Sequence, residues 1–208
     1  AERLFAERGI DRVSMRQINL AAGQKNSSAT QYHFGSKIGL VEALFDYRME
    51  PINARRLELV NRIEDDGDTG DLRRLVEGLV YPLAEQLTNR GAACDYIAIV
   101  AQVSGHPNYH TIAQRRGRHG TGLQRLLALL RRHLTGIPEP VIRVRFGMAL
   151  RQVFSELADY QRLHPAGTGS AGTALFIDNL IDAVTAQFAA PLSVATRQDL
   201  EEAQRKTA

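Results

Sequence analysis

The segment from Ser14 to Lys37 constrains the fold most, because its pattern is that of two short helices joined by a tight turn. Ser14 can cap the first helix, since its hydroxyl can accept a hydrogen bond from a free amide one turn on. Gly23 can end that helix in a left-handed conformation that costs glycine little. The second helix, about Ser28 to Phe34, is too short to be stable alone. The segment is therefore predicted to be a helix-turn-helix, whose second helix enters the major groove of DNA.

The remaining pattern predicts an all-α chain. Along several long segments, apolar residues recur at steps of three and four, whereas the alternation typical of strands is nearly absent. We expect an N-terminal three-helix helix-turn-helix domain at residues 1–45 and a C-terminal helical ligand-binding and dimerisation domain at residues 46–208. A long helical segment crosses this boundary, and Pro51 is expected to kink or split it.

Composition excludes several classes of protein. The net charge of +3 is too small to indicate nucleic-acid binding by itself, so that prediction rests on the motif. The single cysteine, Cys94, excludes an internal disulfide and fits a reducing cytoplasm. No signal peptide and no run of eighteen apolar residues is found, so we expect a cytoplasmic protein with no membrane partner.

No catalytic or metal-binding pattern stands out. Cys94 and the serines lack a motif that would activate them, so we expect no enzyme activity. His106 and His110 are four residues apart, but Pro107 lies between them and no carboxylate or cysteine completes a ligand set. We expect neither a metal nor a cofactor.

In the helix-turn-helix, side-chain chemistry assigns two kinds of DNA contact. The cations and hydroxyls expected to contact phosphates, which fix position without reading sequence, are Arg16, Lys37, Ser14, Ser27 and Ser28. The residues expected to face base edges from the exposed side of the second helix are Thr30, Gln31, Tyr32 and His33, with Ala29 placed against a thymine methyl. The alternative is that Tyr32 and His33 only hold the domain together.

Three sequence blocks carry a family resemblance. LFAERGIDRVSMRQINLAAG (Leu4 to Gly23), YHFGSK (Tyr32 to Lys37) and GLVEAL (Gly39 to Leu44) resemble the N-terminal domain of the TetR family of transcriptional repressors. The resemblance implies that Phe34 packs into the three-helix core. It also implies that the first helix begins before Ala1 and that a basic arm is missing from the N-terminus.

The resemblance further implies a homodimer on a palindromic operator, with two recognition helices in successive major grooves. Segments 141–163 and 173–188 carry more apolar surface than one side of a monomer core needs. The residues expected at the dimer interface are Ile142, Val153, Phe176, Leu180, Val184 and Phe188. The alternative is that these residues form the core of a monomer.

A small-molecule effector is expected in the body. The aromatic and soft residues that could line its site are Tyr81, Tyr96, Tyr109, Phe146 and Met148. The apolar stripes show no carboxylate or arginine, so a largely apolar ligand is expected. The alternative is that these are ordinary core residues.

These patterns predict a sequence-specific transcriptional regulator, a repressor released from its operator by a small, largely apolar ligand. The alternative is a helical small-molecule-binding protein or enzyme in which the helix-turn-helix is only structural. The number of hydrogen-bonding side chains on the outer face of the second helix favours DNA binding.

Overall fold

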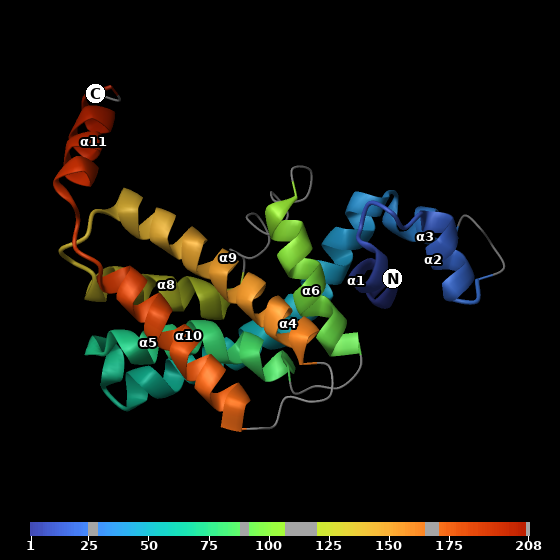
Figure 1. Ribbon diagram of the computed structural model, residues 1–208, viewed down its shortest axis with the longest axis horizontal. Helices are drawn as coiled ribbons and strands as arrows, with labels where there is room; N and C mark the ends of the chain where they lie inside the picture. The colour runs from blue at the N-terminus through green and yellow to red at the C-terminus, as the bar shows by residue number, and fades with distance from the viewer. Residues whose placement is uncertain (25–28, 88–91, 107–119, 165–170, 207–208) are drawn as a thin grey trace.

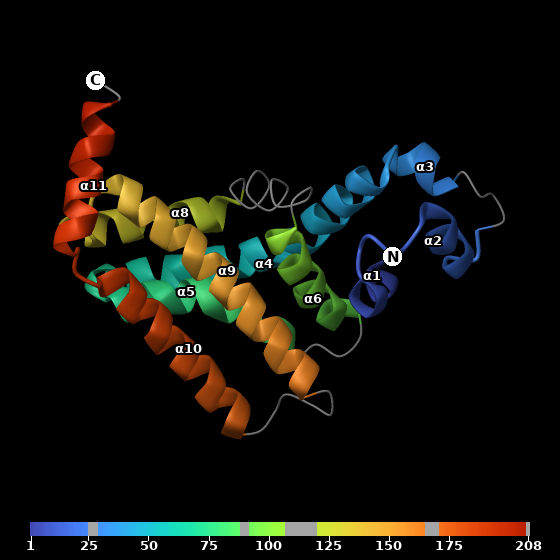
Figure 2. The ribbon, with the colours of Figure 1, turned by 45° about the horizontal axis from the view of Figure 1, so that its top comes forward.

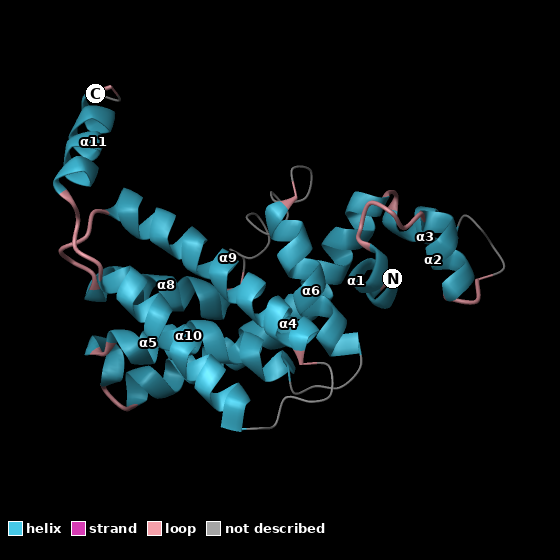
Figure 3. Ribbon diagram, viewed as in Figure 1, coloured by secondary structure: helices cyan, strands magenta, loops and turns pink. Residues whose placement is uncertain are grey.

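The computed structural model describes residues 1–24, 29–87, 92–106, 120–164 and 171–206, and every regular element in these ranges is helical (Figures 1 and 3). The expected all-α class is confirmed. The α-helices are α1 (Glu2–Arg8), α2 (Met15–Ala21), α3 (Ala29–Phe34), α4 (Lys37–Asp65), α5 (Leu72–Ala84), α6 (Ala92–Gly105), α8 (Thr121–His133), α9 (Glu139–Leu163), α10 (Ala171–Ala189) and α11 (Val194–Arg205). Short 3-10 turns at Asp68–Gly70 and Glu85–Leu87 flank α5.

Helices α1 to α3 form a head at one end of the molecule (Figure 1). Helix α1 ends at Gly9, whose φ of 85° lies in the left-handed region and whose amide bonds to the carbonyl of Phe5. Phe5, Val13 and Ile18 are buried together with Val41 from the first turns of α4. The start of α4 therefore belongs to the core of the head.

Helix α4 connects the head to the body as one helix of 29 residues. Ser36 caps it by accepting a hydrogen bond from the amide of Gly39 at 3.1 Å. Pro51 lies inside α4, so the expectation that it splits the segment is wrong. Met49 and Ile52 on either side of the proline are buried, and their packing stabilises the helix through it.

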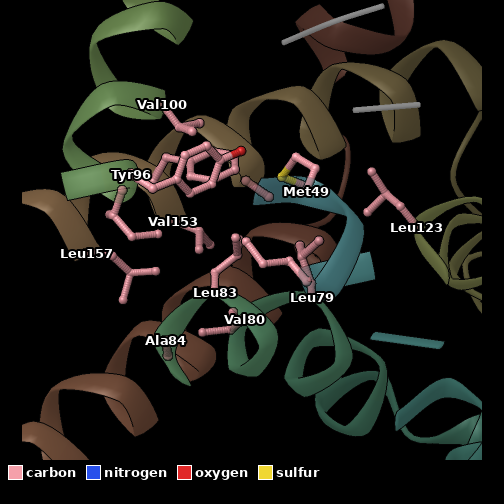
Figure 4. Packing of buried hydrophobic residues seen from close by; sticks show 14 of the residues in the cluster. Met49, Leu79, Val80, Leu83, Ala84, Tyr96, Val100, Leu123, Val153 and Leu157 are labelled. Atoms are coloured by element: carbon pink, nitrogen blue, oxygen red, sulfur yellow. The ribbon is translucent and has the colours of Figure 1, made fainter. Parts of the chain in front are cut away.

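The body packs α5 against α4, α8 and α10, and α9 against α6 and α10. Helix α5 lies deep in this arrangement, since Leu75, Leu79, Leu83 and their neighbours are fully buried. Figure 4 shows Leu83 of α5, Val100 of α6 and Val153 of α9 gathered in one apolar core.

Helices α9 and α10 form an antiparallel pair that is tied at both ends. The hydroxyl of Tyr160 lies 2.9 Å from that of Thr173, and Arg145 donates to the carbonyl of Phe188 at 2.7 Å. Helix α11 projects from the opposite end of the molecule to the head and contains no buried residue (Figures 1 and 2). In the described ranges, no helix is both long and apolar enough to cross a membrane.

Candidate nucleic-acid interface

The N-terminus of α2 is closed by a reciprocal pair of hydrogen bonds. The Ser14 hydroxyl accepts from the amide of Gln17 at 3.2 Å, and the Gln17 side chain accepts from the amide of Ser14 at 2.7 Å. This confirms the cap expected at Ser14 and adds Gln17 as its partner. Ser14 itself is exposed, and Arg16 is exposed on the first turn of α2.

A buried polar contact fixes α3 on α2. Asn19 is 1% exposed. Its side-chain oxygen, Oδ1, accepts a hydrogen bond from the backbone amide of Thr30 at 3.1 Å and another from the Thr30 hydroxyl. Thr30 is 8% exposed, so its placement on the exposed side of α3 is wrong. Its hydroxyl is used inside the head, where it helps to set the position of α3. The signal for this contact was Asn19, a polar residue that directly follows Ile18 of the apolar stripe.

Of the residues expected to face base edges, Gln31, Tyr32 and His33 are exposed on α3. Tyr32 is 85% exposed, and its ring meets that of His33 edge to face at 5.4 Å. No core contact therefore explains the tyrosine, and its phenol and the amide of Gln31 are free to meet base edges.

Phe34 does not pack into the core of the head. It is 39% exposed, and its ring lies 6.4 Å from that of His33. Helix α3 ends here, and Gly35, with φ of 69°, turns the chain toward α4. The ring is thus at the rim of the head rather than between its helices.

The Lys37 ammonium group donates to the carbonyls of Ile10 and Asp11 at 3.0 and 3.1 Å. It thereby ties the start of α4 to the loop after α1, and a third proton remains for another acceptor. Ser27 and Ser28 lie outside the described residues. Ala29 begins α3, but its side chain is not described.

The head also contacts the body through α6. The Gln102 side chain donates to the carbonyl of Phe5 at 3.3 Å and accepts from the amide of Ile10 at 3.2 Å. Arg48 of α4 holds Glu2 of α1 through two hydrogen bonds of 2.6 Å. Helix α1 is therefore anchored on both the connecting helix and a body helix.

A second link joins the end of α6 to the loop between α1 and α2. The Nε2 atom of His106 lies 2.7 Å from a carboxylate oxygen of Asp11. His110, its neighbour in the sequence pattern, lies outside the described residues. The described histidine thus has a structural contact at the junction of head and body.

The residues expected at the dimer interface are mostly core residues of the single subunit. Those with at most 4% of their surface exposed are Ile142, Val153, Leu180, Val184 and Phe188. Phe176 is half-buried and stacks on Tyr160 with 4.2 Å between ring centroids. The assignment of the five buried residues to a partner surface is wrong, because the most regular apolar stripe of each helix faces its own subunit. For Phe176 it stays a prediction.

The opposite faces of α9 and α10 carry exposed apolar side chains. Val144 is 61% exposed and Met148 48% exposed on α9, and Leu175 is 72% exposed on α10.

Four of the five residues expected around an effector are described, and they differ in burial. Tyr96 is 1% exposed and meets Phe45 edge to face at 6.2 Å. Phe146 is half-buried against the core, and Tyr81 is half-buried, where burial raises the pKa of its phenol. Met148 is exposed and cannot line an enclosed site, which corrects its assignment. Tyr109 lies outside the described residues.

Arg56 is the buried residue that sequence reasoning missed. It is 1% exposed, and burial lowers the pKa of its guanidinium to about 10. The signal was its position: the buried residues of α4 include Met49, Ile52, Arg56, Val60 and Ile63, at steps of three and four. Its neighbour Arg55 faces outward and pairs with Glu85. Two consecutive arginines therefore lie in different environments, which the sequence alone does not distinguish.

Comparison with known families agrees with this arrangement. Residues 77–190 match the tetracyclin repressor-like C-terminal domain, and residues 1–44 match the bacterial regulatory proteins of the tetR family. A search among curated proteins found no match. The first of these matches alone covers more than half of the chain, and the second covers the head with its exposed α3. The chain therefore belongs to the TetR family and is a DNA-binding transcriptional regulator rather than an enzyme.

Proposed function

We propose that this regulator is a repressor that binds a palindromic operator as a homodimer and leaves it when a small molecule binds in the body. The observation that carries the proposal is the outer face of α3. Gln31, Tyr32 and His33 are exposed there, on a helix whose position is fixed by the buried Asn19–Thr30 contact. An amide, a phenol and an imidazole presented together on one helix are groups that can reach base edges in the major groove.

In this proposal, Gln31, Tyr32 and His33 read bases, while phosphates are bound by Arg16, by the third ammonium proton of Lys37 and by Ser14. Phosphate contacts set the register of α3, and base contacts supply the sequence preference. Ser27, Ser28 and Ala29 are retained as contacts at the N-terminus of α3, in the same roles that the sequence suggested.

The proposed dimer uses the outer faces of α9 and α10. Exposed Val144, Met148 and Leu175 support this face, because two-fold symmetry lets one apolar patch cover its own copy. Two heads related by that axis would meet half-sites about 34–36 Å apart, which is one turn of DNA.

Release from DNA requires that the effector bind two states of the protein with different affinity. The contacts of Gln102 with Phe5 and Ile10 support α6 as the connection, because a displacement of α6 in the body would move α1 directly. The ion pair between Arg48 and Glu2 would transmit a displacement of α4 in the same way.

The proposal is tested by selecting DNA from a random pool with the full chain and measuring affinity for the enriched sequence. Tyr32→Ala and Gln31→Ala are expected to weaken specific binding by about 1–3 kcal/mol and to relax the preference at individual positions. Lys37→Ala should weaken binding to all sequences and reduce the salt dependence. Glu201→Ala, an exposed change on α11, is the control and should alter neither.

Enrichment of an inverted repeat would support the dimeric operator. If no sequence is enriched, or if the α3 variants keep full affinity, the recognition-helix assignment is wrong. The alternative, in which the helix-turn-helix is only structural, would then be favoured.

A further inference from the structure

We propose that the effector is an amphipathic organic anion whose carboxylate or similar group binds Arg56 inside the body. This inference rests on the proposed function, since it names the chemical class of the effector. It replaces the apolar ligand expected from the sequence, and it starts from a buried cation that has no anionic partner among the described residues.

The other arginines that point from α4 toward neighbouring elements are paired with carboxylates. Arg48 is bound to Glu2, and Arg55 is bound to Glu85 and Glu58. Among the described residues, Arg56 has the neutral side chain of Asn53 as its hydrogen-bond partner, which accepts from Nη1 at 2.7 Å. Its Nε–H has no acceptor among the described residues although it is buried. A buried charge without a counter-ion is expensive, and an anion at this place would remove that cost.

The surroundings of Arg56 add to the positive potential instead of balancing it. Helix α8 begins beside Asn53, and its N-cap residue is Gly120, which has no side chain to accept from the first-turn amides. The approach is close, since a Cβ at Gly122 would lie 2.6 Å from the carbonyl oxygen of Asn53 and 3.2 Å from the Cβ of Arg56. The positive end of a helix therefore lies next to the buried guanidinium, and both attract an anion.

A second buried donor lies in the same region. The Tyr96 hydroxyl has no hydrogen-bond partner among the described residues, although the side chain is 1% exposed. Among the described residues, the Tyr96 phenol and the Arg56 guanidinium interact electrostatically, which places the two side chains near each other. A carboxylate accepts hydrogen bonds through two oxygens, so it can use both a guanidinium and a phenol.

Next to these donors the interior is apolar. Figure 4 shows Met49, Leu79 and Leu83 on the side of the core toward which the Tyr96 hydroxyl points, with Leu123 of α8 beyond Met49. A ligand with its anionic end at Arg56 would therefore place an apolar portion among these side chains. That combination selects an amphipathic monoanion over a free inorganic ion.

The test uses the full chain with two matched pairs of probes, decanoate with decanamide and 2-naphthoate with 2-naphthamide, read by thermal shift. At least one carboxylate is expected to raise the melting temperature of the wild type by several degrees, while its amide does not. Arg56→Met keeps the apolar stem and should abolish the shift. Arg55→Met, which changes the adjacent, partly exposed arginine, is the matched control and should keep the shift.

Tyr96→Phe removes only the hydroxyl and provides a second variant should Arg56→Met fold poorly; it should reduce the affinity for the carboxylate about three- to tenfold. The inference is overturned if no carboxylate shifts the melting temperature, if amides act as well as carboxylates, or if the shift persists in Arg56→Met.

Operator binding separates this inference from the proposed function. If the carboxylate binds through Arg56 but no operator can be selected, the site stands and the repressor assignment fails. If an operator is bound and the carboxylate leaves its affinity unchanged, the anion is not an effector and the inference fails.

Discussion

Asn19 and Arg56 are polar residues that follow the apolar spacing of their helices, and both are almost completely buried. Asn19 satisfies the first-turn amide of α3 and the Thr30 hydroxyl. Among the residues that the structure describes, Arg56 has one partner, the neutral side chain of Asn53. At the scale of single residues, the contact between Asn19 and Thr30 stabilises the head. The contact between Arg56 and Asn53 leaves the charge of the buried guanidinium without an anionic partner among the described residues.

The Asn19–Thr30 contact predicts an unequal pair of mutational effects. Asn19→Ala should lower the free energy of unfolding by about 1–3 kcal/mol, because it leaves the buried Thr30 amide without an acceptor. Thr30→Val keeps the shape and should cost only about 1 kcal/mol. Urea denaturation measures both, with Gln31→Ala as the exposed control. Equal and negligible costs would show that the contact does not fix α3.

Removing the buried charge of Arg56 is expected to raise the free energy of unfolding. Burial holds the pKa of the guanidinium below its usual value, at about 10, so protonating it costs more in the folded chain. The cost is on the order of 3 kcal/mol and is fully present at neutral pH. It diminishes only as the pH rises above about 10, because the folded state then releases the proton first.

Without ligand, Arg56→Met is therefore expected to have a free energy of unfolding about 1–3 kcal/mol higher than that of the wild type. Urea denaturation measures this difference as a higher midpoint concentration. Arg55→Met removes exposed ion pairs and should change stability by less than about 1 kcal/mol. A large loss of stability in Arg56→Met would instead indicate a structural role for the guanidinium.

At the scale of elements, α1 is held by α4 on one side and by α6 on the other. Gln102 is the central residue of the second contact, because its one amide group pairs with both a carbonyl and an N–H of the head. Gln102→Leu should leave these backbone groups unpaired and weaken the attachment of α1 by about 1–3 kcal/mol. Hydrogen exchange should show faster opening of residues 5–10, while Gln124→Leu on the exposed face of α8 serves as the control.

If exchange in residues 5–10 is unchanged in Gln102→Leu, α6 does not hold the head in place. A route from the body to DNA through α4 alone would then be favoured. The ion pair of Arg48 with Glu2 lies on that route.

At the scale of the whole molecule, the outer face of α9 and α10 is the proposed dimer interface. The double variant Val144→Glu/Met148→Glu places two charges on the proposed interface, and burying them would cost several kcal/mol. The molecular mass measured by light scattering should fall from that of a dimer to that of a monomer of 23.0 kDa. Val194→Glu, at an equally exposed position on α11, should remain dimeric. A wild-type monomer at micromolar concentration would contradict the dimer and with it the palindromic operator.

The sequence by itself determined the class of the fold and the form of the head. Local signals suffice there: the Ser14 cap, the end of α1 at Gly9 and a helical period that persists wherever the chain is apolar. The exposure of Gln31, Tyr32 and His33 on α3 could be read from these signals, because caps and periods depend only on neighbours along the chain.

Only the tertiary structure decided which neighbour each face meets. The apolar stripes of α9, which contains Val153, and of α10, which contains Val184, were regular enough to predict an interface. In the fold, both stripes face the core of their own subunit. Thr30, Phe34 and Arg56 were misplaced or missed for the same reason. A helical period gives the direction in which a side chain points, whereas its burial depends on contacts between segments that are far apart in the sequence.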